Sequence, residues 1–156
     1  MRIFLTNIFL ALAITTVAAF CADNTIGAWK LNVEKSKYSP APTPVKSLTA
    51  TREASDGGVK VTATGEQTNG TAINGSYTAK YDGTDVMVTG NLPYDTISIK
   101  QANANTLTEE RKKMGGPYHA MSRVVVSNGG KTMTTTTKGT NTEGKDFTST
   151  FVFDKQ

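Results

Sequence analysis

Three charged side chains occupy positions that a β-strand pattern turns toward the inside of the fold. Alternation places Arg52 on the face of the apolar Leu48, and it places Glu109 and Arg111 on the face of Leu107. Charges among apolar side chains lower stability unless they are paired or hydrated, so a solid core would not hold three of them. A barrel with an open lumen could hold them, together with water, an ion pair or an anionic ligand. A β-bulge that flips either strand, or a place at the open rim, is the alternative.

These residues suggest a site for a molecule with an acidic head and an apolar body. The planar guanidinium group of Arg52 or Arg111 offers two parallel donors that match a carboxylate. Glu109 would hold one of the arginines when the site is empty. Tyr77 and Tyr81, inward on the predicted strand 71–81, would line the apolar part and add a hydroxyl donor. The candidate ligand-binding residues are therefore Arg52, Tyr77, Tyr81, Glu109 and Arg111.

The residues for metal, cofactor or covalent chemistry are scarce. The chain has one histidine, His119, and one cysteine, Cys21, far apart and without a carboxylate cluster. No nucleophile elbow, dinucleotide-binding or phosphate-loop motif occurs. We therefore expect no metal, no cofactor and no catalytic residues, with a haem held by His119 as the alternative.

The net charge of +4 is mild, and the basic residues are scattered. The triplet at 111–113 lies on a strand-like segment, where a solvated strand end is the expected interpretation and a nucleic-acid patch the alternative. We expect no nucleic-acid partner and a monomer.

The N-terminus has the features of a secretory signal peptide. A single positive charge at Arg2 precedes an apolar stretch, and Val17-Ala18-Ala19 satisfies the small-residue rule for cleavage. We expect cleavage after Ala19, a flexible segment over 20–24, and a secreted or periplasmic protein without a transmembrane span. Lipidation of Cys21 is the alternative, although Phe20 stands where a lipoprotein signal favours a small residue.

The rest of the chain, 25–156, is predicted to form one all-β domain. Short segments that alternate apolar and polar residues are separated by Asn-Gly, Asp-Gly and Gly-Gly pairs, which accept the backbone of tight hairpins. The predicted strands cover 45–54, 59–67, 71–81, 85–90, 96–102, 106–114, 118–127, 131–139 and 145–154, after a first strand that holds Trp29. We predict a single antiparallel up-and-down β-barrel of about 8–10 strands, with no helix after the signal peptide, because closure leaves no open edge. A β-sandwich is the alternative.

The first strand carries the only tryptophan. Trp29, Leu31 and Val33 alternate with polar residues and are predicted to face inward. Prolines at 40, 42 and 44 follow, and because proline cannot donate to a sheet ladder, they predict an extended connection across one end of the fold.

Gly27-Ala28-Trp29 is similar to the G-x-W motif that opens the first strand of lipocalins and their calycin relatives. This resemblance implies that Arg123, on a late strand, packs over Trp29 at the closed end of the barrel. The length and hairpin rhythm resemble the fatty-acid-binding proteins, and "WKLNVEKSKYSP" with "GGKTMTTTTKGTNTEGKDF" resembles a group of small exported bacterial proteins of undescribed activity. The chain departs from the fatty-acid-binding pattern, because prolines replace the two helices and the last strand lacks the Arg-x-Tyr that grips a carboxylate.

Three classes of function agree with these observations. The first is an exported protein that binds a small hydrophobic or amphipathic molecule in the lumen. The second is a structural or protein-interaction domain of the cell envelope, with a flat Thr-rich face such as 134–137. The third is an enzyme of calycin shape. A cavity of several hundred Å³ would favour the first or the third.

Overall fold

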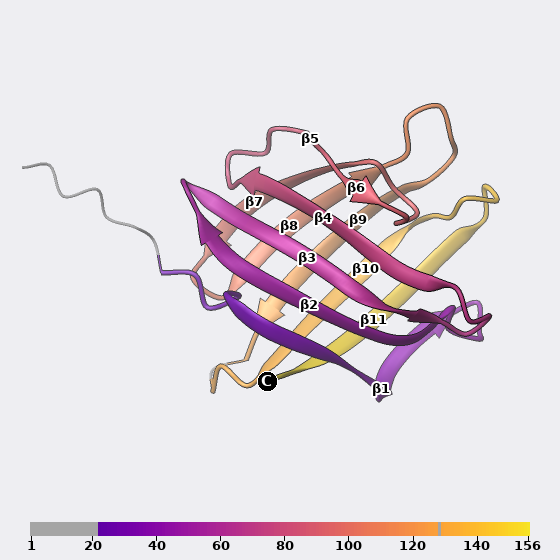
Figure 1. Ribbon diagram of the computed structural model, residues 1–156, viewed down its shortest axis with the longest axis horizontal. Coiled ribbons are helices and arrows are strands. Elements are labelled where there is room, and N and C mark those ends of the chain that lie inside the picture. Colours follow the sequence, from indigo (N-terminus) through magenta and orange to yellow (C-terminus); the bar gives the residue numbers. More distant parts are fainter. Residues whose placement is uncertain (1–21, 128) are drawn as a thin grey trace, which may run out of the picture.

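The computed structural model describes residues 22–127 and 129–156, and within them every regular element is a β-strand (Figure 1). The predicted signal peptide, its cleavage site and Cys21 lie outside the described residues. The strands are β1 (Gly27–Ser39), β2 (Val45–Ser55), β3 (Gly58–Gln67), β4 (Ala72–Lys80), β5 (Val86–Met87), β6 (Thr89–Gly90), β7 (Thr96–Asn103), β8 (Thr106–Lys112), β9 (His119–Val126), β10 (Thr132–Thr140) and β11 (Asp146–Lys155). No helix in this part of the chain is long and apolar enough to cross a membrane.

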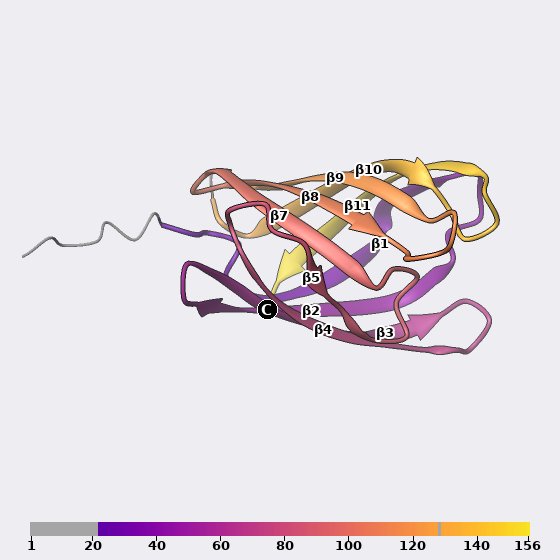
Figure 2. The same cartoon turned by 90° about the horizontal axis from the view of Figure 1, so that it is seen from above.

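All strands belong to one antiparallel sheet, in the order β5-β7-β8-β9-β10-β11-β1-β2-β3-β4-β6. The first and last long strands, β1 and β11, pair side by side. The sheet curls into a flattened barrel, with β7 to β11 on one side and β2 to β4 on the other (Figure 2). The up-and-down barrel predicted from the sequence is confirmed.

The segment predicted as one strand over 85–90 forms two very short strands, and these nearly close the barrel. Val86 of β5 pairs with Ile97 of β7, and Gly90 of β6 pairs with Gly75 of β4. The same segment thus contacts both edges of the sheet. Since the two edges do not pair along their length, the barrel is almost closed, and this segment connects the edges together with a bridge between Asp82 and Lys100.

Tight turns join the long strands where the sequence has its Gly pairs. Gly57, between β2 and β3, has a φ of +67°, and Gly70, between β3 and β4, has a φ of +85°. Residues with a Cβ rarely adopt this conformation, so these glycines fix the hairpin positions and with them the strand register.

Trp29 seals one end of the barrel. It is fully buried, and its indole Nε1 donates a hydrogen bond of 2.7 Å to the carbonyl oxygen of Thr25. The cation over its ring is Lys155, whose Nζ lies 5.1 Å from the ring centroid. The expectation for Arg123 is wrong, because Arg123 is exposed on the outer face of β9. Lys155 takes this place because β1 and β11 pair directly at Trp29 and Lys155.

A bulge in β1 redirects the second half of that strand. The pairing with β11 shifts between Asn32 and Lys37, and Ser36 bridges the irregularity, donating to the Asn32 carbonyl and accepting from the Val152 amide. The predicted inward position of Val33 is therefore wrong, since Val33 is 40% exposed. Beyond the bulge β1 no longer pairs with β2, and the proline-rich connection over 40–44 joins the two strands at the end of the barrel opposite Trp29.

Candidate functional site

A cavity of about 560 Å³ occupies the lumen of the barrel. Strands from both sides of the barrel line it, and the connections that contain Pro44, Leu92 and Asn141 surround its open end. Most of its wall is apolar, as the side chains of β2, β3 and β4 that face it show. The apolar residues of these strands that line it are Val45, Leu48, Ala50, Val61, Ala63 and Ile73, and Arg52, Gln67 and Tyr77 line it as well. A cavity of this size can enclose a molecule of some tens of atoms.

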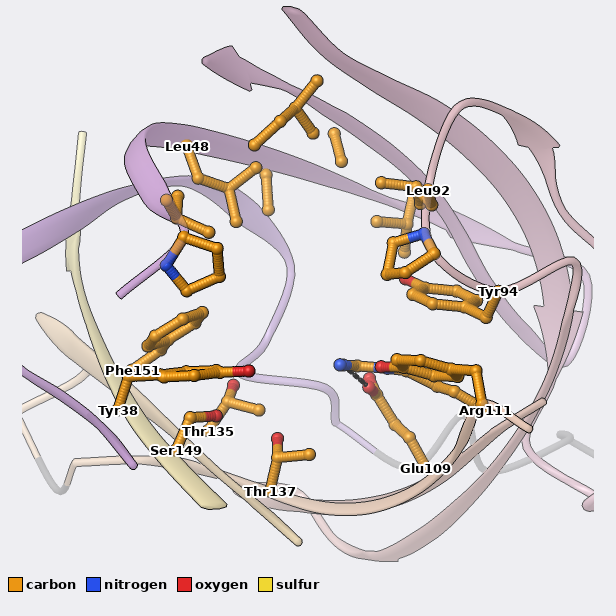
Figure 3. Close-up of a pocket in the computed structure, with 18 of the residues that line it drawn as sticks. Tyr38, Leu48, Leu92, Tyr94, Glu109, Arg111, Thr135, Thr137, Ser149 and Phe151 are labelled. Atoms are coloured by element: carbon orange, nitrogen blue, oxygen red, sulfur yellow. Dashed lines mark hydrogen bonds and ion pairs between the residues drawn. The ribbon is translucent and has the colours of Figure 1, made fainter. Parts of the chain in front are cut away.

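Arg52, Glu109 and Arg111 come together in this cavity, as the alternation predicted. Arg52 is 5% exposed and Glu109 only 1% exposed. The Nη1 of Arg52 lies 3.6 Å from one carboxylate oxygen of Glu109, and the Nη2 of Arg111 donates to the other oxygen (Figure 3). The Nε of Arg52 also donates to the hydroxyl of Thr25, at 3.2 Å. Glu109 is thus shared by two arginines, and the group carries one net positive charge.

The electrostatics keep Glu109 ionised. Burial by itself raises the pKa of a carboxyl group, but the charges of Arg111 and Arg52 outweigh it, so the pKa of Glu109 lies below its ordinary value. The carboxylate therefore neutralises one of the two guanidinium groups, and among the described residues no second carboxylate forms a direct ion pair with either arginine.

Two donors of this cluster have no hydrogen-bond partner among the described residues: Nη2 of Arg52 and Nε of Arg111. Almost all buried donors in proteins are hydrogen-bonded, and an unpaired one costs free energy. Both side chains line the cavity, and the guanidinium of Arg111 lies 5.4 Å from the ring centroid of Tyr94. The arrangement can accept an anionic group from a molecule in the lumen.

The two predicted tyrosines have different positions. Tyr77 of β4 is buried and lines the cavity, and burial raises its pKa. Tyr81 packs against the core and is absent from the cavity lining, and its role in contacting a ligand stays a prediction. Tyr81 follows the end of β4 and its hydroxyl donates to Asp23, which also accepts from the hydroxyl of Thr25. Tyr81 therefore holds the segment before β1 against the closed end of the barrel. The backbone amide of Asn24, in the same segment, donates a hydrogen bond to the carbonyl oxygen of Ala104.

The sequence analysis missed a row of aromatic rings near the open end. Tyr38 stacks on Phe147 at 5.7 Å between centroids, Phe147 lies 6.1 Å from Tyr118, and Tyr118 stacks on Tyr94 at 5.9 Å. All four rings line the cavity. Tyr38 and Tyr94 lie where strand alternation is uninformative, after the bulge of β1 and in the connection before β7. Tyr118 begins the predicted strand 118–127, and alternation places it on the same face as Val124, so Tyr118 and Phe147 could be placed inward from the sequence.

Other chemical groups lie outside the cavity. His119 is exposed, and its Nε2 lies 2.8 Å from a carboxylate oxygen of Glu110. Within the described ranges no group of three or more His, Cys, Asp or Glu side chains could hold a metal ion. Of the basic triplet at 111–113, Arg111 points inward, whereas Lys112 pairs with Asp85 and Glu110 on the outer surface.

The Thr-rich segment 134–137 does not form the flat outer face considered above. Thr135 and Thr137 are buried and line the cavity, whereas Thr136 is exposed. Alternation along β10 divides these threonines between the two faces of the sheet.

Comparison with known proteins adds information on the fold. No family model matches the chain, and neither does any curated protein sequence. A protein of unknown function from the DUF3598 family of Nostoc punctiforme aligns with a TM-score of 0.54 and 14% identity, covering 93% of this chain and 53% of that one. The present chain thus spans about half the length of that protein. The zebrafish ileal bile acid-binding protein, solved with cholic acid, aligns with a TM-score of 0.50 and 10% identity, covering 86% of this chain and 100% of that one.

At these identities the likeness concerns the fold. Both alignments extend over most of the described barrel, and the topology is a continuous up-and-down sheet. The chain therefore has a calycin-like β-barrel fold with a lumen cavity. Fold alone does not assign an activity, which must be argued from the site.

Proposed function

We propose that this protein binds an amphipathic small molecule in its lumen, with the acidic head of the ligand at Arg52 and Arg111. The observation that carries the proposal is the pair of buried guanidinium nitrogens without partners, Nη2 of Arg52 and Nε of Arg111, in a cavity that is otherwise largely apolar. A carboxylate in the lumen would offset the remaining positive charge and can accept hydrogen bonds from a guanidinium group.

The apolar wall would supply most of the binding affinity, and the two arginines would orient the ligand. Binding sites for small molecules are usually apolar cavities of roughly 300–1,000 Å³ with a few placed polar groups, and this cavity, at about 560 Å³, has that character. The bile acid-binding protein of similar fold, solved with cholic acid, supports the proposal by analogy.

A titration with a fluorescent fatty-acid analogue tests the proposal. Wild type should bind, and Arg52→Met and Arg111→Met should each weaken binding by about 1.5–3 kcal/mol, the value of a hydrogen bond to a charged group. Arg123→Met is the matched control, because Arg123 has the same charge but is exposed on the outer face of β9. Thermal unfolding of each variant, monitored by circular dichroism, verifies that it is folded.

The same titration distinguishes the alternatives. Equal affinities of wild type and both lumen variants would contradict a role of the arginines in binding. Absence of binding by folded wild type would contradict the proposal itself and would favour a structural or interaction domain.

We also propose that the protein is exported, with its mature N-terminus at Phe20. The support is the sequence of residues 1–19, with a charged start, an apolar stretch and a small-residue cleavage site. Intact-mass measurement of the protein from its host should give the mass of residues 20–156. A diacylglyceryl adduct on Cys21 would instead show a lipoprotein.

A further inference from the structure

A row of polar side chains crosses the inner wall of the barrel. The register places Glu109 of β8 opposite Ser122 of β9, Ser122 opposite Thr137 of β10, Thr137 opposite Ser149 of β11, and Ser149 opposite Tyr38 of β1. Five adjacent strands thus each contribute one polar side chain at the same level. We call these five residues the polar row.

The neighbouring levels contain mainly apolar or small residues. Toward the closed end the next level holds Leu107, Val124, Thr135 and Phe151. Toward the open end the next level holds Arg111, Ala120, Gly139 and Phe147. The hydroxyl groups are therefore concentrated on one level, which begins at the carboxylate between the two arginines.

The polar row faces an apolar wall across the cavity. In Figure 3 the side chains of Thr137, Ser149 and Tyr38 lie on one side of the cavity, and Leu48 and Leu92 lie on the other. Thr135 adds a further hydroxyl on the polar side. A molecule that fills this cavity meets hydroxyl groups on one face and hydrocarbon on the opposite face.

The hydroxyl groups of the inner wall have different neighbours. Ser122 and Thr137 bond each other, with 2.9 Å between their hydroxyl oxygens. Ser149 and Thr135 are 7% and 8% exposed, and both line the cavity. Since a hydroxyl group can donate one hydrogen bond and accept others, both side chains are suited to a polar group in the lumen.

The spacing along the polar row sets where such groups would lie. Adjacent strands are about 4.8 Å apart, so Thr137 lies roughly 10 Å and Ser149 roughly 14 Å along the wall from Glu109. If the acidic group of a ligand lies at the arginines, its polar groups roughly 10 Å and 14 Å further along the molecule would lie at the hydroxyl groups of Thr137 and Ser149.

We propose that the ligand is a hydroxylated amphipathic acid, with its hydroxyl groups along one face and an apolar opposite face. This inference rests on the proposed binding function and narrows the class of ligand. Two kinds of molecule share this chemistry: a fused-ring acid with hydroxyls on one side, and a fatty acid with hydroxyls on its chain. Ser149 and Thr137 are the residues that would select for the hydroxyl groups, since the Thr137 hydroxyl can still accept a hydrogen bond beside the one it shares with Ser122.

Displacement of the bound fluorescent fatty-acid analogue by matched pairs of acids tests the proposal. The first pair is cholic acid and its unhydroxylated parent, 5β-cholanic acid. The second pair is 12-hydroxystearic acid and stearic acid. Wild type should prefer the hydroxylated member of at least one pair by about fivefold or more, the usual effect of one buried hydrogen bond. The pair that shows the preference identifies the kind of ligand.

Variants of the polar row link any preference to its cause. Ser149→Ala and Thr137→Val should reduce the preference to about twofold or less, while the affinity for the unhydroxylated acid stays within about twofold of the wild-type value. Thr136→Val is the matched control, because it removes a hydroxyl from the outer face of the same strand. It should leave the preference unchanged.

The outcomes separate this inference from the proposed function. Equal affinity for both members of each pair, or a preference that survives in Ser149→Ala and Thr137→Val, would overturn the hydroxyl selection and leave acid binding intact. Failure of wild type to bind the probe or any of the four acids would overturn both proposals.

Discussion

Arg52 and Glu109 form an ion pair across the lumen, with 3.6 Å between Nη1 and Oε1, although β9, β10, β11 and β1 separate their strands in the sheet. The pair therefore connects opposite walls of the barrel. Because both side chains are buried, the contact influences stability as well as the charge available to a ligand.

Removing the shared carboxylate should strongly destabilise the protein. Glu109→Met removes the ion-pair partner of the buried Arg52 and the partly buried Arg111, and breaking a buried ion pair in this way costs about 3–5 kcal/mol. Urea denaturation monitored by circular dichroism measures the change. The triple variant Arg52→Met/Glu109→Met/Arg111→Met should recover most of the loss, because no charge remains to be desolvated. A triple variant as unstable as Glu109→Met would show that packing, rather than charge, causes the loss.

Acid should destabilise the protein partly through Glu109. The pKa of Glu109 lies below its ordinary value of 4.5, because the attraction of Arg111 and Arg52 exceeds the effect of burial. Its ionisation therefore stabilises the fold fully above pH 4.5, and this contribution disappears as the pH falls through the lower pKa of the folded state. Wild type should lose more unfolding free energy than Glu109→Gln between neutral and acid pH. Parallel losses in the two proteins would contradict this account.

All five tyrosines should ionise at a higher pH in the folded protein than in the unfolded chain. Burial is the main cause for each of them, and it raises the pKa of Tyr94 to about 12 from the ordinary 10.0. Ultraviolet absorbance of tyrosinate during alkaline titration measures this, with the protein in denaturant as the reference. Because the neutral tyrosines favour the fold, stability should be complete below pH 10.0 and decrease as the pH rises above it. A native titration that overlays the denatured one would contradict the buried positions.

The closed end should depend on Trp29 and Lys155 and not on Arg123. Trp29→Ala should cost about 3–5 kcal/mol of unfolding free energy, because a fully buried aromatic side chain is removed. Lys155→Ala should cost about 0.5–1 kcal/mol through loss of the cation–π contact, whereas Arg123→Ala should change stability by about 0.5 kcal/mol or less. Chemical denaturation of the three variants measures these values. A larger effect for Arg123→Ala than for Lys155→Ala would contradict the contact described here.

Alternation predicted much of the site because side-chain direction in a regular strand depends only on residue parity. Arg52, Tyr77, Glu109 and Arg111 lie on regular stretches of β2, β4 and β8, and each lines the cavity as expected. The same rule failed at Val33, where the bulge of β1 shifts the register. It also could not place Tyr94, which lies in a connection between strands.

The sequence by itself determined an all-β chain, its turns, and which side chains of the regular strands face inward, because these properties are local. Only the tertiary structure decided which inward residues meet. The Arg52–Glu109 pair depends on the curvature that brings β2 and β8 across the lumen, and the polar row depends on the register of five strands. Lys155, and not the predicted Arg123, lies over Trp29 for the same reason. The pairing of β1 with β11 brings together residues from opposite ends of the chain. Curvature and register arise from contacts between distant segments, which alternation along one strand cannot specify.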